Sequence, residues 1–236
     1  MRRLLGGLGT YPDYFLRLRE VNRRGPTVYG DHRPSLRGLS PAELLREVTG
    51  GAELVDVRLI DAFAAGHIPG ALSIALRDAF ASWLGWLVPA ERPLVFVLDA
   101  GQDRDELIRQ CLKVGYERLV GELAGGMEAW RASGRRVART ELRAGPRALA
   151  APLLDVRQAD EFTRGHVPGA VHVELGSVRI QAEYLATVAA AVMCGHGERA
   201  MSAASLLERA GGQVSVFLGG PEDWARGTRE SLESGA

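Results

Sequence analysis

The feature that most constrains this chain is an internal repeat. Residues 54–71 align without a gap with residues 153–170. Both segments contain Asp-Val-Arg followed by Gly-His-x-Pro-Gly-Ala, and further on each copy has a Gly-Gly pair four residues before a tryptophan. Each copy is about a hundred residues long, which is the commonest domain size. We therefore expect a duplicated domain.

Within each copy, short apolar runs alternate with stretches of helical periodicity. Such alternation is typical of an α/β fold, here two parallel sheets that each carry helices on both faces. We expect an N-terminal extension over 1–37, domains over 38–138 and 148–236, and a linker over 139–147 between them. Buried strands are predicted at 53–57, 94–98, 118–123, 153–156, 190–194 and 214–218, and helices at 105–114 and 199–210.

Composition excludes several classes of function. The formal net charge is +0, so no basic field favours nucleic acid or an anionic membrane surface. No apolar run approaches the ~18 residues of a membrane span, and the apolar stretch near the N-terminus is too short for a signal peptide. Two cysteines do not form a disulfide framework. We expect a soluble, cytoplasmic protein without a cofactor, and five scattered histidines indicate no metal site.

The strongest chemical signal is Cys194, at the end of a predicted strand and about five residues before a predicted helix. Ligands bind at the carboxyl ends of strands in open α/β sheets. The intervening loop of Gly195, His196, Gly197 and Glu198 has two glycines, so its backbone N–H groups can turn inward. These donors, the positive end of the helix dipole and the guanidinium of Arg199 would stabilise an anion.

Such a loop favours the thiolate, the nucleophilic form of Cys194. A cysteine held this way can attack a sulfane sulfur, carry it as a persulfide and pass it to a second thiol. Cys111 is predicted to be a packing residue because it lies in the middle of a helix. In the first copy, alignment places Leu98 opposite Cys194 and Asp103 opposite Arg199. The first domain is therefore expected to be catalytically silent.

Three histidines invite a functional interpretation. His67 and His166 occur at equivalent positions of both copies, including the silent one, which favours a structural role. His196 lies inside the cysteine loop, where either donation to the bound sulfur or a solvated position is open.

Two further pairs of residues have spacings that indicate either a role at the site or a role in packing. Asp155 and Arg157 have equivalent residues in the first copy, which is expected to be silent. We therefore expect them to brace the loop rather than to contact substrate. Trp83 and Trp86 are spaced like neighbours on one helix face and are expected to pack in a core or between domains.

These motifs together resemble the rhodanese domain, over residues 38–135 and again over 148–228. A silent first copy with an active second copy resembles the two-domain thiosulfate and mercaptopyruvate sulfurtransferases. The resemblance implies that Cys194 is the active cysteine and that the backbone from Gly195 to Arg199 cradles the substrate.

The order of the motifs is also similar to the C-terminal half of bacterial fusions in which a metallo-β-lactamase-fold persulfide dioxygenase precedes two rhodanese domains. Residues 11–26 resemble the end of that dioxygenase domain. The chain has no His-x-His-x-Asp-His run, so dioxygenase activity is not carried over. A separate persulfide dioxygenase remains a candidate partner.

We therefore expect a sulfurtransferase that moves sulfur from thiosulfate or a small-thiol persulfide to a thiol or cyanide through Cys194. The alternative is a sulfur carrier or binding module that works with a dioxygenase. Four residues separate Cys194 from Arg199, whereas related phosphatases and arsenate reductases have one more, which disfavours those activities. Glu198 adds a negative charge to the loop, so we expect thiosulfate to be the poorer donor.

Overall fold

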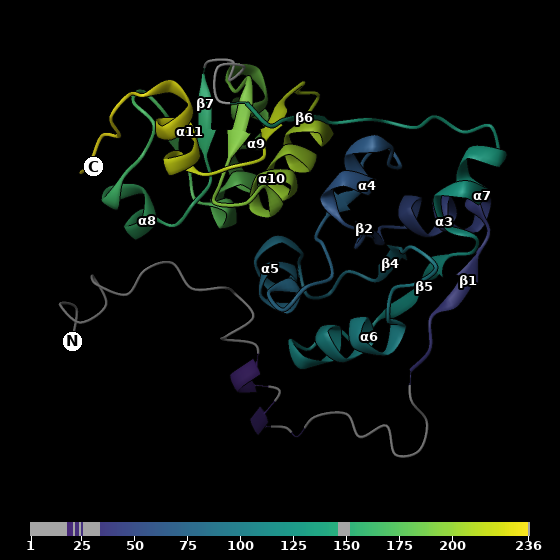
Figure 1. Cartoon of the computed structure of the whole chain (residues 1–236). Coiled ribbons are helices and arrows are strands. Elements are labelled where there is room, and N and C mark those ends of the chain that lie inside the picture. The colour runs from purple at the N-terminus through teal and green to yellow at the C-terminus, as the bar shows by residue number, and fades with distance from the viewer. Residues whose placement is uncertain (1–17, 21, 24, 26–33, 146–151, 236) are drawn as a thin grey trace.

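The computed structural model describes residues 18–20, 22–23, 25, 34–145 and 152–235. Two five-stranded sheets form the framework, and every strand pair in them is parallel. The strand orders are β1-β5-β4-β2-β3 and β6-β10-β9-β7-β8, so the two sheets have the same topology. The predicted α/β fold with two similar modules is confirmed, and Figure 1 shows the modules side by side.

The first module runs from β1 to α7. Its β4 is a run of four apolar residues that are all buried, as expected for a strand covered on both faces of a parallel sheet. Its elements are β1 Arg37–Leu39, α3 Pro41–Thr49, β2 Glu53–Asp56, α4 Ile60–Ala65, β3 Leu72–Ser73, α5 Phe80–Leu87, β4 Leu94–Val97, α6 Arg104–Lys113, β5 Leu119–Leu123 and α7 Gly126–Ala132.

The second module runs from β6 to α11. Its elements are β6 Glu141–Arg143, β7 Leu153–Asp155, α8 Ala159–Arg164, β8 Val171–His172, α9 Leu175–Val188, β9 Ala191–Met193, α10 Glu198–Arg209, β10 Ser215–Phe217 and α11 Pro221–Thr228. The strands and helices expected from periodicity are present, and each end differs from the expected one by at most one residue.

One segment differs from the expected organisation. Residues 141–143, which we expected in a linker, form β6 and pair in parallel with β10 at the edge of the second sheet. Three residues are too few for a hydrophobic period to be recognised, so only the pairing reveals the strand. Most of the segment 11–26, on which the likeness to a dioxygenase domain rests, lies outside the described residues, as does most of the extension 1–37. None of the helices in the described part of the chain has the length and apolarity that a bilayer crossing requires.

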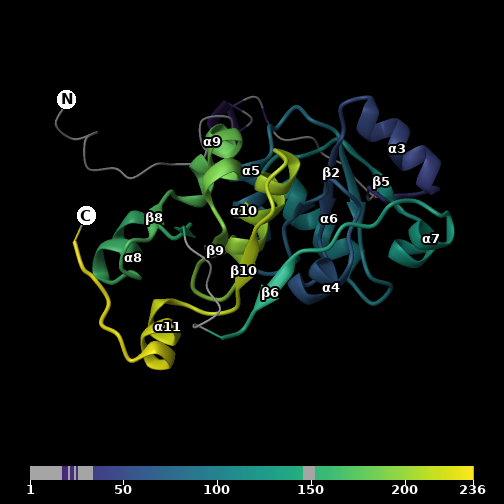
Figure 2. The same ribbon diagram turned by 90° about the horizontal axis from the view of Figure 1, so that it is seen from above.

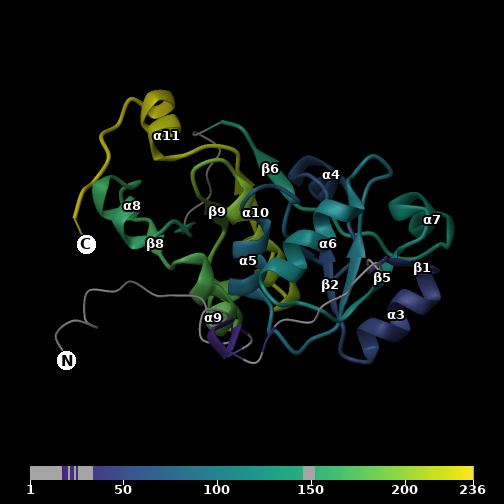
Figure 3. The same cartoon turned by 90° about the horizontal axis from the view of Figure 1, so that it is seen from below.

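Helix α10 lies between the two modules (Figures 2 and 3). Its residues from Ala200 to Leu207 are all buried, as is typical of a helix covered on every side. The Ser202 hydroxyl donates to the Ser73 carbonyl oxygen at 2.6 Å, and the Ser73 amide donates to the Ser205 hydroxyl at 3.1 Å. The helix that follows the cysteine loop is thus hydrogen-bonded to the first module.

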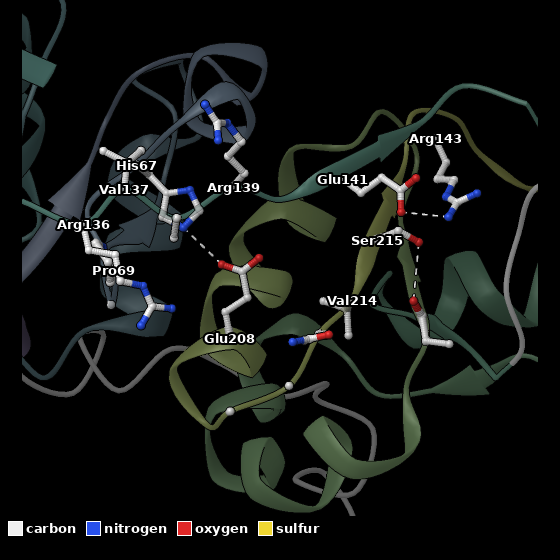
Figure 4. Close-up of a pocket in the computed structure, with 16 residues that line it drawn as sticks. His67, Pro69, Arg136, Val137, Arg139, Glu141, Arg143, Glu208, Val214 and Ser215 are labelled. Atoms are coloured by element: carbon white, nitrogen blue, oxygen red, sulfur yellow. Dashed lines mark hydrogen bonds and ion pairs between the residues drawn. The ribbon is translucent and has the colours of Figure 1, made fainter. Parts of the chain in front are cut away.

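Charged groups fix the end of α10 to the first module as well. The Arg209 guanidinium lies 2.5 Å from a carboxylate oxygen of Glu53, whose side chain is 4% exposed. Figure 4 shows His67 reaching from the first module to Glu208, with 3.2 Å between Nε2 and the carboxylate. Trp86 packs on α9 at Gly176, which confirms an interdomain role for that tryptophan.

Figure 4 also shows a groove between the modules, with a volume of about 730 Å³. It is lined by Ala190 and Ser215, which lie at the amino ends of β9 and β10. Cys194 follows the carboxyl end of β9, so the length of this strand separates the groove from the cysteine.

Candidate functional site

Cys194 directly follows β9 and is 1% exposed. The backbone amide of Gly197 donates to its Sγ at 3.1 Å, so the loop turns inward as predicted. Gly197 is also the N-cap of α10, a helix of 12 residues. The sulfur therefore lies where an amide and the positive end of a helix dipole both favour negative charge.

Gly197 is required by its conformation and by its neighbours. Its φ of +91° lies in the left-handed region that favours glycine. A Cβ at this position would lie 3.1 Å from Ile60 Cδ1 and 3.1 Å from Leu218 Cδ2. Ile60 belongs to the first module, so that module forms part of the wall around the cysteine loop.

Arg199 is the second residue of α10, and its guanidinium is held by Glu161 of α8. Two parallel hydrogen bonds join them, Nη1 to Oε2 at 2.5 Å and Nη2 to Oε1 at 2.8 Å. Bidentate pairs of this kind are strong and fix the plane of the guanidinium. The hydrogen bonds from Arg199 lower the pKa of Glu161 to about 2. The Glu161 carboxylate, and then the negative charge of Cys194, raise the pKa of Arg199.

Sequence reasoning missed Glu161, which lies 38 residues from Arg199 along the chain. A capping box at the start of α8 is the one local signal, because Glu161 also accepts a hydrogen bond from the Gln158 amide at 3.0 Å. That motif indicates a helix start and carries no information about the partner across the fold.

The side chains of Asp155 and Arg157 are almost completely buried. The Arg157 guanidinium binds the Asp155 carboxylate at 2.7 Å, the Gly165 carbonyl oxygen at 2.8 Å and the Glu161 carbonyl oxygen at 3.3 Å. These contacts tie the end of β7 to both ends of α8, which carries Glu161. In the first module, Arg58 makes two of these contacts, with the Asp56 carboxylate and the Gly66 carbonyl oxygen. This duplication supports the bracing role that we expected.

His67 and His166 have matching surroundings in the two modules. Each ring stacks on the phenylalanine four residues earlier, with centroids 3.8 Å and 3.7 Å apart, and contacts that residue's carbonyl oxygen at 3.0 Å. Neither contact involves Cys194, in agreement with a structural role. His196 is exposed within the cysteine loop.

The Gly-Gly pair of each repeat allows close contact with the loop after the central strand. A Cβ on Gly220 would lie 3.3 Å from the Gly195 carbonyl oxygen. In the first module, a Cβ on Gly126 would lie 3.0 Å from the Leu98 carbonyl oxygen. The motif therefore has a packing reason that is independent of any reaction.

The first module has no thiol at the equivalent position, because Leu98 follows β4. Its loop also differs in length. Helix α6 begins six positions after Leu98, whereas α10 begins four positions after Cys194. Asp103 caps α6 by accepting from the Glu106 amide at 3.0 Å. Cys111 is fully buried, and burial raises the pKa of its thiol, so it stays in the neutral form.

Two residues of the cysteine loop face the first module. Beside Ile60 at Gly197, the guanidinium of Arg77 binds the Glu198 carboxylate at 2.8 Å. Sequence reasoning missed Arg77 and Ile60, because both lie more than a hundred residues away from the loop. The Cys194 thiol thus lies in a loop whose wall is built by residues of both modules.

Among the proteins that resemble this chain are one relative in sequence and two solved structures. The putative sulfur carrier protein YrkF of Bacillus subtilis is 34% identical over 74 residues, which are 30% of this chain and 40% of that protein. The thiosulfate sulfurtransferase of Pseudomonas aeruginosa is 21% identical with a TM-score of 0.36, covering 94% of this chain and 47% of that one. A probable thiosulfate sulfurtransferase is 23% identical with a TM-score of 0.36, covering 77% of this chain and 97% of that one. The matches thus span less than half the length of the first two proteins.

A family model gives a broader match. The model of the rhodanese-like domain matches residues 40–133 and again residues 138–226. The first match covers β2 to β5 of the first sheet, and the second covers all strands of the second sheet together with the whole cysteine loop. Because the two copies together account for most of its residues, the chain belongs to the rhodanese family.

Proposed function

We propose that this protein is a sulfurtransferase that carries sulfane sulfur on Cys194. The observation that supports this best is the hydrogen bond from the Gly197 amide to Sγ at the N-terminus of α10. Anion-stabilising groups at that point favour the thiolate before the reaction and the terminal sulfur anion after it.

In the first half-reaction, the Cys194 thiolate attacks the outer sulfur of the donor. With a protonated persulfide, the new S–S bond forms as the donor S–S bond breaks, and the donor leaves as a thiolate while Cys194 becomes a persulfide. With thiosulfate, sulfite leaves in the same way. In the second half-reaction, a thiolate or cyanide attacks the terminal sulfur, and the Cys194 thiolate is restored. No external oxidant or reductant is consumed.

The residues around the loop have distinct proposed roles. Gly195, His196, Gly197 and Glu198 form the cradle, and Arg199 holds its shape because Glu161 fixes the guanidinium. Asp155 and Arg157 position α8 and therefore Glu161. Glu161 offsets the positive charge of Arg199, and Glu198 offsets that of Arg77. The loop therefore offers little excess positive charge to the dianion thiosulfate, which favours a persulfide of a small thiol.

A second candidate is a sulfur carrier that takes up one sulfur and releases it to a protein partner. The name of the Bacillus subtilis relative favours this possibility. In that case a persulfide dioxygenase is the partner that we propose, since it would consume the transferred persulfide. The number of turnovers separates the two candidates, because a carrier alone would stop after one sulfur per chain. The loop spacing argues against a phosphatase, and hydrolysis of an aryl phosphate would contradict that argument.

Intact-protein mass spectrometry after brief exposure to thiosulfate or to a small-thiol persulfide tests the proposal. We expect the wild type to gain about one sulfur mass and to lose it when cyanide or a thiol is added. The matched control is Cys194→Ser, which keeps Cys111 and should gain nothing. An equal gain on Cys194→Ser, or no gain on the wild type with any donor, would overturn the proposed function.

A further inference from the structure

Arg77 lies in the first module, between β3 and α5, and its backbone is held in place by neighbours. Its carbonyl oxygen accepts from the Phe80 amide at 2.9 Å and from the Gln110 side chain at 3.1 Å. The Gln110 side chain is in turn held by the Ala81 amide at 3.0 Å and by Glu106 at 2.8 Å. The backbone that carries Arg77 is therefore anchored to α6, while the Arg77 side chain is 56% exposed.

The Arg77 side chain reaches across to the cysteine loop. Its Nε lies 2.8 Å from a carboxylate oxygen of Glu198, and Glu198 directly follows the glycine whose amide binds the Cys194 sulfur. The Glu198 side chain is 43% exposed. The silent module thus places a cation at the rim of the reactive loop.

The two arginines near the loop differ in how firmly they are paired. Arg199 makes a bidentate pair with Glu161, and its side chain is only 18% exposed, so it is committed to that partner. Arg77 makes one exposed contact, and exposed ion pairs of this kind contribute little stability because water screens them. Little free energy is therefore lost when Arg77 leaves the Glu198 carboxylate and binds another anion instead.

We propose that Arg77 and Glu198 together select the sulfur donor. Arg77 exchanges its partner for the carboxylate of an incoming persulfide, and Glu198 then faces the donor's ammonium group. The charges of Arg77 and Glu198 complement the persulfide of an α-amino-acid thiol. Such a donor carries a carboxylate and an ammonium group a few atoms from its sulfane sulfur. A guanidinium suits this role because it binds carboxylates in a fixed geometry. This inference rests on the proposed function, since it concerns the donor that reaches Cys194.

The test compares donors that differ in one charge. Persulfides of cysteine, of 3-mercaptopropionate and of cysteamine present both charges, the carboxylate alone and the ammonium alone. For Arg77→Gln we expect KM to rise about tenfold with cysteine and mercaptopropionate persulfides and to stay unchanged with cysteamine persulfide. For Glu198→Gln we expect the reverse selectivity, with KM rising for cysteine and cysteamine persulfides. Arg77→Lys should restore part of the affinity.

Arg37→Gln is the matched control, because Arg37 is 59% exposed and is paired with glutamates on the first module away from the cysteine loop. It should behave as the wild type with all three donors. A loss of folding would change kcat and KM with every donor alike, so only donor-dependent changes support the inference. If Arg77→Gln alters all three donors equally, or none, the inference is wrong although Cys194 still accepts sulfur. If Cys194 accepts sulfur from no donor, the proposed function itself has failed.

Discussion

Replacing Gly197 with alanine would test the geometry of the cysteine loop directly. The backbone at this residue has a φ of +91°, and the added methyl group would lie 3.1 Å from both Ile60 Cδ1 and Leu218 Cδ2. Gly211 offers a matched comparison at the other end of α10. Its φ is +88°, but a Cβ there would have no atom within 4 Å.

Both substitutions place an alanine in a left-handed backbone conformation, but only Gly197→Ala also crowds neighbouring side chains. A left-handed conformation costs a residue with a Cβ about 1–2 kcal/mol, and the stiffer unfolded chain returns about 0.4–1 kcal/mol of this. Gly211→Ala should therefore lose about 1 kcal/mol of unfolding free energy. Gly197→Ala should lose about 1 kcal/mol more, at the low end of the overpacking range, because the crowded atoms are the ends of flexible side chains.

Urea unfolding of both variants measures this difference, and mass spectrometry of the Cys194 persulfide measures its consequence for the reaction. Relief of the crowding would move the loop backbone, so we expect slower sulfur uptake in Gly197→Ala and an unchanged rate in Gly211→Ala. Equal losses of stability together with equal rates of uptake would refute the reasoning, because the contact with Ile60 would then have no energetic or chemical effect.

Two further predictions concern ion pairs. Glu161→Gln should lower the unfolding free energy by about 1–2 kcal/mol near neutral pH. Since the pKa of Glu161 is lowered to about 2, the pair stabilises the folded state above the ordinary pKa of 4.5 and is lost as pH falls towards 2. Urea titrations should thus show the gap between wild type and variant closing as the solution is acidified, and a gap independent of pH would contradict the assignment. Arg209→Met leaves the buried Glu53 with only its exposed partner Arg92 and should cost about 2–3 kcal/mol, whereas an unchanged urea midpoint would show that this contact does not stabilise the domain interface.

Much of the fold could be predicted because the sequence pattern of the domain occurs twice in the chain. Buried strands of a parallel sheet are mainly apolar runs, and β2 and β4 of the first module recur in the same order as β7 and β9 of the second. The cysteine loop could be predicted equally well from the sequence. Cys194, Gly197 and Arg199 are close together in the chain, and their geometry follows from a strand, a turn and the start of a helix. Local chemistry was therefore enough to place the thiol at the N-terminus of α10.

The tertiary structure decided which groups surround that thiol. Glu161 becomes the partner of Arg199 only because β7 and β9 pair side by side, which brings α8 beside the start of α10. Ile60 and Arg77 reach the loop only because α10 is buried against the first module. The sequence alone determined the reactive group and the strand and helix that present it. The packing of two sheets determined its charged surroundings, because contacts between residues far apart in the chain leave no periodicity to read.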